Sequence, residues 1–271
     1  MKTKARVIAF YLPQYHPIPE NDKYWGKGFT EWNNVAKAKP LFRGHDQPRI
    51  PADLGFYDLR LPEIREQQAE LAREAGVEGF CYWHYWMGGG KELLERPFNE
   101  VVDSGKPDFP FCLGWANHTW STRTWNSHKG REGGEVIAEQ TYPGVEDYTD
   151  HFNKYLKAFK DKRYIKVEGK LLFVVFSPRH FDDFKTFKAC WNRLATENGL
   201  EGFYFVGITE NFGITSVTAE GKKKRDYVAK TREEMELMAN DSYQDIRDRG
   251  YDGVNSRGDT RANVLSESFY S

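Results

Sequence analysis

The sequence has little that would place it in a membrane or on a nucleic acid. Its 271 residues have a mean hydropathy of −0.75 and no run approaching the roughly 18 apolar residues of a membrane-spanning helix. Neither charge is in excess, because 39 Lys and Arg oppose 40 Asp and Glu and leave a net charge of −1. A general nucleic-acid binder needs a basic face that neutralises phosphates, so this balance argues against one.

Cysteine is scarce, and a leader sequence is not evident. The three cysteines Cys81, Cys112 and Cys190 lie far apart and are odd in number, which predicts reduced, mostly buried thiols. The first apolar run is short, ends at Pro13 and has no small-residue cleavage site, so we interpret it as a β-strand rather than a signal peptide. Together these features predict a cytoplasmic protein.

Several catalytic signatures are also absent from the sequence. No H-x-H or H-E-x-x-H pair supports a metal site, although His16, His84 and His118 could converge. No G-x-S-x-G motif supports a serine nucleophile, and no Gly-rich phosphate loop follows the first apolar run. We therefore expect neither a metal nor a cofactor. The missing phosphate loop weakens, but does not exclude, a transferase that uses sugar nucleotides.

Aromatic residues are unusually abundant. They make up 15% of the chain, and seven of the eight tryptophans fall between Trp25 and Trp125. Packing explains a part of them. Trp and Tyr interleaved with His, Asn and Glu favour a pocket that stacks on the flat faces of a sugar and bonds its hydroxyls.

A helix–glycine–strand joint recurs three times. The copies are Ala75 to Phe80, Asn198 to Phe203 and Arg249 to Val254, and in each one Gly ends a helix and a second Gly begins a strand. Apolar residues at helical spacing precede the first two copies. This repetition predicts an α/β protein with parallel strands.

The predicted strands are uniformly apolar, as buried parallel strands should be. They span Arg6–Leu12, Gly79–Trp86, Phe111–Ala116, Leu171–Ser177, Phe203–Thr209 and Gly253–Ser256. We expect a single domain over residues 1–271 with a (β/α)8 TIM-like barrel fold, since no dinucleotide fingerprint supports a doubly wound sheet. Eight strands need two more units, so the barrel is expected to be incomplete at the C-terminus, and its open edge to promote self-association.

Polar and aromatic residues gather where the predicted strands end, which is where barrel enzymes carry their chemistry. We predict substrate contacts from Tyr11, Tyr15, His16, Glu31, Trp32, His84, Tyr85, Trp86, Trp115, Asn117, His118, Trp120, Arg123 and Glu210.

Each of these candidates also has a purely structural interpretation. Tyr11 and Tyr15 could pack in the core, and His16 could bond a loop carbonyl. Glu31 could cap a loop or pair with a nearby cation, and His84 could be a satisfied core histidine.

The residues that follow the third predicted strand form the most specific group. They include Trp115, Asn117 and Trp120. Arg123 could hold a carboxylate or phosphate, or only its own loop, and Glu210 could cap the segment after its strand. The basic run at 222–225 is interpreted as a solvated helix start.

Four ordered motifs carry a resemblance to a known family. Y-L-P-Q-Y-H-P at 11–17, G-F-T-E-W at 28–32, Y-W-H-Y-W at 82–86 and W-A-N-x-x-W at 115–120 resemble the WbsX family of bacterial polysaccharide gene clusters. The resemblance covers roughly residues 5 to 210. It implies a fold similar to the family 99 glycoside hydrolases, which are α-mannosidases and α-mannanases on a (β/α)8 barrel.

The same resemblance implies a later motif that this sequence lacks. Family members typically carry W-N-E-W-x-E-G and a following E-P, whose glutamates correspond to the catalytic pair of the family 99 enzymes. Glu267 stands in an unrelated context, so the catalytic residues here are unknown. Glycoside cleavage needs two carboxylates, and Glu31 and Glu210 are not assigned as that pair.

Three functions therefore remain open. The first is a family 99-like hydrolase of an α-mannose-type or related bacterial glycan. The second is a glycosyltransferase of surface-polysaccharide assembly, which the family name and the predicted cytoplasmic location favour. The third is an inactive glycan-binding protein, which the absent glutamate pair favours.

Overall fold

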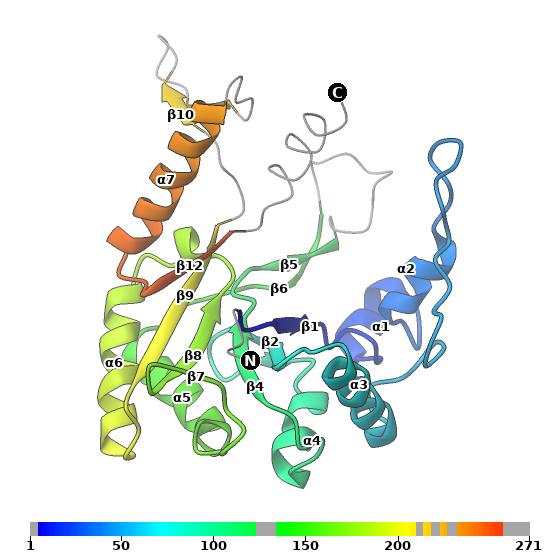
Figure 1. The fold of residues 1–271 in the computed structure, drawn as a ribbon, viewed down its shortest axis with the longest axis horizontal. Coiled ribbons are helices and arrows are strands. Elements are labelled where there is room, and N and C mark those ends of the chain that lie inside the picture. Colours follow the sequence, from blue (N-terminus) through cyan, green and yellow to red (C-terminus); the bar gives the residue numbers. More distant parts are fainter. Residues whose placement is uncertain (1–4, 123–133, 210–213, 218–222, 227–231, 257–271) are drawn as a thin grey trace.

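The protein is built around a sheet of six parallel strands in chain order. The structure, a computed structural model, describes residues 5–122, 134–209, 214–217, 223–226 and 232–256. The parallel strands are β1 (Ile8–Tyr11), β2 (Gly79–Trp86), β4 (Phe111–Trp115), β8 (Lys170–Val175), β9 (Phe203–Thr209) and β12 (Gly253–Ser256) (Figure 1). All six predicted strands are confirmed, with ends that move by at most two residues.

The order of the strands distinguishes a barrel-like sheet from a doubly wound sheet, the two folds considered from the sequence. Each strand pairs in parallel with the next one along the chain, as in β1–β2 and β8–β9, without the reversal of a doubly wound sheet. The α/β class and a parallel, half-barrel sheet are therefore confirmed. Closure into eight strands and a truncated C-terminus remain predictions. Two short strands, β3 (Glu92–Leu93) and β7 (Lys166–Val167), pair antiparallel with β2 and β8.

Five helices connect these strands and cover one face of the sheet. They are α3 (Pro62–Glu74), α4 (Arg96–Ser104), α5 (Val145–Phe159), α6 (Phe184–Glu197) and α7 (Arg232–Asp248). Their apolar sides pack on the strands in a largely aromatic core, with Phe152, Phe173 and Trp191 at its centre. Among the described residues, these five helices lie on this face of the sheet.

The glycine joints have the geometry that their sequence predicts. Gly76, Gly199 and Gly250 have φ of 77°, 75° and 104°, so each ends its helix in the left-handed region. Gly79, which opens β2, is needed for space, because a Cβ there would lie 2.4 Å from the Pro110 carbonyl oxygen. The joints therefore fix where each strand starts.

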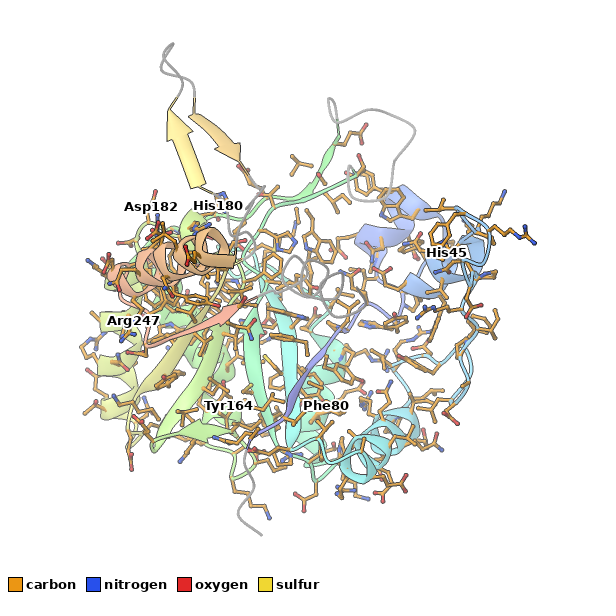
Figure 2. All side chains as sticks on the ribbon, turned by 45° about the horizontal axis from the view of Figure 1, so that its top comes forward. His45, Phe80, Tyr164, His180, Asp182 and Arg247 are labelled. Atoms are coloured by element: carbon orange, nitrogen blue, oxygen red, sulfur yellow. The ribbon has the colours of Figure 1, made fainter. Side chains whose placement is uncertain are left out.

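Short elements gather at the carboxyl-terminal end of the strands. They are α1 (Pro19–Trp25), α2 (Glu31–Lys37) and a hairpin of β5 (Trp120–Ser121) and β6 (Val136–Ala138). In Figure 2, Phe80 marks the beginning of the strands and His180, after β8, the opposite end, from which this hairpin extends. Loops at this end of the sheet are placed to form a site.

One expectation about secondary structure is wrong. The basic run at 222–225 was expected to begin a helix, but β11 (Lys223–Asp226) pairs antiparallel with β10 (Ile214–Val217). Backbone pairing with a neighbouring segment overrides the local helix preference of lysine. Within the residues that the structure describes, no helix is both long and apolar enough to cross a membrane.

Candidate functional site

The two faces of β2 carry different sets of aromatic residues. Side chains alternate along a strand, so Tyr82 and His84 point toward the helices while Trp83 and Tyr85 point to the opposite face. The contacts agree, because Tyr82 packs on Phe98 of α4 and His84 on His151 of α5. The face opposite the helices is the inner face of the half-barrel.

Aromatic rings line this inner face near the carboxyl ends of the strands. The Phe10 ring stacks on Trp83 with centroids 4.7 Å apart and planes 8° apart, and Phe10 is 47% exposed. Phe176 meets Trp83 edge-on at 5.5 Å, and the exposed His118 lies 5.1 Å from Phe176. We call these four residues the aromatic wall. It is drawn from β1, β2 and the segments after β4 and β8.

Gly114 makes room for this wall. It pairs with Trp83 in the β2–β4 register and therefore lies on the same face. A Cβ at Gly114 would lie 2.9 Å from the Trp83 ring, closer than real Cβ contacts. The absence of a side chain thus lets the indole lie across β4 and reach Phe176.

Tyr85 continues the inner face toward the loops. It is buried, and Trp120 packs edge-on against it at 4.8 Å. Its hydroxyl accepts a hydrogen bond from Nε2 of Gln14 at 3.4 Å, while Oε1 of Gln14 is buried without a partner among the described residues. Two predicted residues, Tyr85 and Trp120, therefore lie together beside the wall.

Glu31 is the first residue of α2, and its backbone is bonded to Gln14. Thr30 caps this helix, with Asn33 completing a capping box, and the Glu31 amide donates to the Gln14 carbonyl at 3.2 Å. Nδ2 of Asn34 donates to Oε2 of Glu31 at 3.3 Å. Burial raises the pKa of the Glu31 carboxyl, which the Asn34 bond only partly offsets.

Tyr15 and Trp32, the residue after Glu31, form an aromatic contact separate from the aromatic wall. Their ring centroids lie 4.6 Å apart, and Tyr57 packs against both. The Trp32 indole N–H donates to the Tyr57 carbonyl at 2.8 Å. Both predicted residues are half-buried, and this packing fixes the base of α2.

His16 has the structural contact that was considered as its alternative. Its Nδ1 lies 2.6 Å from the Pro13 carbonyl oxygen, and the side chain is 2% exposed. Burial lowers its pKa more than this hydrogen bond raises it. In this structure Nδ1 of His16 holds the β1–α1 loop through the Pro13 carbonyl.

His84 lies between the sheet and α5 in contact with a second histidine. Its Nδ1 is 3.1 Å from the Gly114 carbonyl oxygen, and its Nε2 is 2.9 Å from Nε2 of His151. A carbonyl only accepts, so His84 carries its proton on Nδ1 and accepts at Nε2 from His151. Burial lowers the pKa of His84 to about 3 and that of His151 as well, so both rings are neutral.

Trp86 and Trp115 enclose this histidine pair. The Trp86 ring stacks on His151 at 4.8 Å and its N–H donates to Asp147 at 3.0 Å. Trp115 is 1% exposed, packs edge-on against His151, and donates to the Trp86 carbonyl at 2.8 Å. These tryptophans lie on the helix side of the sheet, away from the aromatic wall.

Asn117 and Tyr11 are also held by the protein itself. The Asn117 amide donates to the carbonyl of Ser177 and to Tyr142, and its oxygen accepts from the Ser177 amide at 2.8 Å. This contact joins the ends of β4 and β8. The Tyr11 hydroxyl donates to Gln68 of α3 at 2.6 Å. Neither side chain faces the wall, so we leave both out of the proposed site.

The structure thus divides the predicted residues. At the inner face it packs Tyr85 on Trp120 and His118 on Phe176, and it links Glu31 to Tyr85 through Gln14, whereas Arg123 and Glu210 lie outside the described residues. Sequence reasoning missed Phe10, Gln14, Trp83 and Phe176. The signal that could have found Trp83 is alternation from Tyr85, which places both rings on one face.

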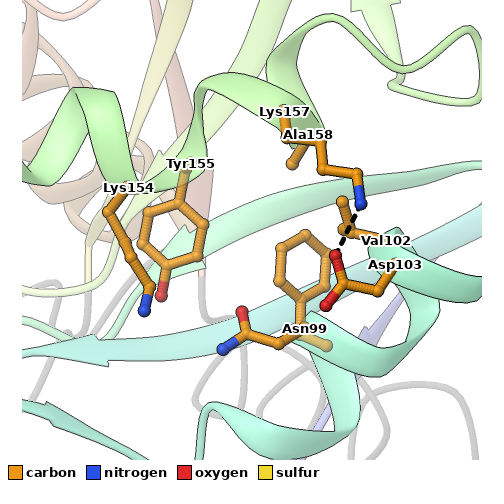
Figure 3. A pocket seen from close by; sticks show the side chains of 8 residues that line it. Asn99, Val102, Asp103, Lys154, Tyr155, Lys157 and Ala158 are labelled. Carbon is orange, nitrogen blue, oxygen red and sulfur yellow. Dashed lines mark hydrogen bonds and ion pairs between the residues drawn. The ribbon is translucent and has the colours of Figure 1, made fainter.

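A cavity of about 270 Å³ lies on the opposite side of the sheet, between α4 and α5 (Figure 3). Lys157 crosses it to Asp103 with Nζ and Oδ1 2.6 Å apart, and Lys154 pairs with Glu92 at 2.8 Å. Since both lysines are already paired, we assign no ligand to this cavity. Among the residues described, no three His, Cys, Asp or Glu side chains group closely enough to hold a metal ion.

Comparison with known sequences identifies a family. The family model described as "Glycosyltransferase WbsX" matches residues 7–263. The chain is 43% identical over 198 residues to "Uncharacterized protein WxcX" from two strains of Xanthomonas campestris pv. campestris. That match covers 72% of this chain and 27% of the relative, so the chain spans about a quarter of the length of these curated relatives.

Solved structures give weaker likenesses. A "Glycoside hydrolase-like protein" superposes with a TM-score of 0.44 at 14% identity, covering 76% of this chain and 52% of that one. The GH99 endo-alpha-mannosidase from Bacteroides thetaiotaomicron gives a TM-score of 0.38 at 12% identity, covering 93% of this chain and 83% of that one.

Proposed function

We propose, because the chain belongs to the glycosyltransferase WbsX family, that it is a carbohydrate-active protein that binds a glycan on the inner face of its half-barrel. The observation that carries this proposal is the aromatic wall. Phe10, Trp83 and Phe176 present ring surface at the carboxyl ends of parallel strands, on the face that the helices do not cover. Rings in that position can stack on the apolar face of a sugar.

Polar groups beside the wall complete a carbohydrate site. The half-buried Glu31 carboxylate lies at its loop side and offers hydrogen-bond acceptors, and the buried bond between Gln14 and Tyr85 holds the loop to which Glu31 is bonded. An apolar ring surface with a few fixed polar groups is the composition expected of a small-molecule site.

Sugar transfer is the reaction that the family description supports, with a polysaccharide or oligosaccharide as the acceptor. Hydrolysis of an α-mannose-type glycan is the alternative, and it requires two carboxylates. Glu31, whose amide is bonded to Gln14, is the carboxylate that we propose for this site. Glycan binding without turnover remains the third prediction.

Titration calorimetry tests the proposal with α-1,2- and α-1,3-mannobiose as probes. We expect Trp83→Ala to weaken disaccharide binding at least about tenfold, equivalent to about 1.4 kcal/mol. Phe42→Ala removes a 66% exposed ring from the 38–57 loop and is expected to bind like the wild type. Wild-type protein that binds neither disaccharide, or Trp83→Ala that binds unchanged, would contradict the proposed function.

Activity assays on the same proteins distinguish sugar transfer from hydrolysis. Transfer predicts that mannobiose grows when GDP-mannose is supplied, whereas hydrolysis predicts mannose release without any nucleotide. Binding with neither product supports the glycan-binding interpretation for this chain.

A further inference from the structure

We propose that Glu31 accepts a hydrogen bond from a hydroxyl of the sugar lying against Trp83, so that this position takes an uncharged sugar residue and rejects the diphosphate of a sugar nucleotide. The inference rests on the proposed function and specifies the ligand of the same site. In a transferase, the sugar at this position would be the acceptor.

Glu31 is held in place by the backbone. It begins α2, whose capping box joins Thr30 and Asn33, and its own amide is bonded to the Gln14 carbonyl at 3.2 Å. Gln14 in turn reaches Tyr85 on β2. The carboxylate is therefore carried on a segment tied to the sheet, and little conformational entropy opposes its use in binding.

Among the described residues, no cation pairs with the Glu31 carboxylate. By contrast, Glu92 pairs with Lys154, and Asp161 with Arg163. Asp147 accepts from the Trp86 indole and the Gly89 amide. Among the described residues, Glu31 receives one side-chain hydrogen bond, from Asn34 to Oε2, which leaves Oε1 as a free acceptor.

The position of Glu31 relative to the wall follows from its neighbours. Tyr85 is two residues after Trp83 on the same face of β2, a separation of about 7 Å. Burial is the larger cause of the raised pKa of Tyr15, and the charge of Glu31 is the second cause. Burial also raises the pKa of Tyr85, and the same charge raises it further. Glu31 is therefore linked to Tyr85 through Gln14, on the loop side of Trp83.

The chemistry of this carboxylate decides the ligand class. A half-buried carboxylate with a free oxygen gains from an O–H donor, because hydrogen bonds to charged groups are the strong ones. A phosphate oxygen brings no donor and adds a second negative charge in a partly desolvated setting. The position therefore favours hydroxyls and disfavours a diphosphate.

Glu31→Gln tests the inference, because it keeps the shape of the side chain and removes the charge. Calorimetry with α-1,2-mannobiose is expected to show at least a tenfold weaker affinity. Binding of GDP-mannose to the same variant is expected to be unchanged or stronger. Glu66→Gln, which removes an exposed charge from α3, should match the wild type with both probes.

Two outcomes would overturn the inference while leaving the proposed function intact. One is Glu31→Gln with wild-type affinity for mannobiose in a protein where Trp83→Ala has lost it. The other is an equal loss of mannobiose and GDP-mannose by Glu31→Gln. If Trp83→Ala keeps its affinity or the wild type binds no saccharide, the proposed function itself fails. Thermal unfolding of Glu31→Gln at the wild-type temperature confirms that the variant is folded.

Discussion

Strand β2 shows side by side how this protein uses similar residues on two faces of one sheet. Toward the helices, His84 and Trp86 are buried and their polar atoms are bonded within the protein. Toward the inner face, Trp83 is partly exposed, and on the loop side the half-buried Glu31 has an acceptor oxygen that receives no donor among the described residues. The difference separates residues that hold the fold from residues that can bind a ligand.

A motif of polar and aromatic residues is therefore weak evidence for a binding site until it is known which face of the sheet each side chain occupies. The helix-side set encloses a neutral histidine pair within rings, where His84 is bonded at both nitrogens and His151 at Nε2. On the inner face, by contrast, Glu31 receives one side-chain hydrogen bond among the described residues. The predictions below separate the two faces, beginning with the largest expected effect.

Trp115→Ala is expected to lower the free energy of unfolding by about 3–5 kcal/mol, because it leaves a cavity between the sheet and helices α5 and α6. Urea unfolding followed by circular dichroism measures this loss. The folded fraction should bind mannobiose like the wild type. A stable Trp115→Ala protein with weakened binding would place Trp115 in the site and contradict the assignment of faces.

The histidine pair is expected to make the helix-side layer sensitive to acid. His84 has a pKa of about 3 when folded and an ordinary value near 6.5 when unfolded, so the unfolded state takes up its proton first as the pH falls. This stability is complete above pH 6.5 and is lost progressively toward pH 3. For His84 alone the loss is about 2 kcal/mol between pH 6.5 and 5. Urea unfolding across this range measures it.

Two variants show whether the pair causes that slope. His151→Phe keeps a ring between Trp86 and Trp115 but removes one titrating group, and should flatten the dependence on pH. His180→Gln changes an exposed histidine of the short helix η2 (Pro178–His180) and should keep the wild-type slope. A wild-type slope in His151→Phe would show that other groups dominate.

Gly114→Ala is expected to have the smallest effect on stability, about 1 kcal/mol, because the added methyl group displaces a partly exposed ring. Its effect on binding should be larger, since Trp83 can no longer lie across β4. Calorimetry with mannobiose should show a severalfold loss of affinity. Unchanged binding would mean that the position of the indole is not important.

Much of the fold could be predicted from the sequence. The recurrent glycine joints located β2, β9 and β12 to the residue, and the apolar runs located the remaining parallel strands. Local rules suffice there, because a positive φ requires glycine and a buried parallel strand requires an apolar run. The hairpin at β10 and β11 was missed, since its pairing depends on two segments meeting.

The site could be predicted only in part. Motif position selected Glu31 and Tyr85, which Gln14 links, and it also selected His84, Trp86 and Trp115, which lie on the helix side. Adjacent residues of a strand cannot share a face, so Tyr85 and Trp86 could not both line one site. In a uniformly apolar strand, the sequence does not show which of the two alternating sets of side chains faces the helices.

The sequence by itself determined the family, the α/β class and the start of each parallel strand, because these depend on local patterns of glycine and apolar residues. Only the tertiary structure decided which face each ring occupies, that His84 meets His151, and that Trp83 lies over Gly114. Those relations join residues about 30 to 70 positions apart. They are set by strand register and helix packing, which no single segment encodes.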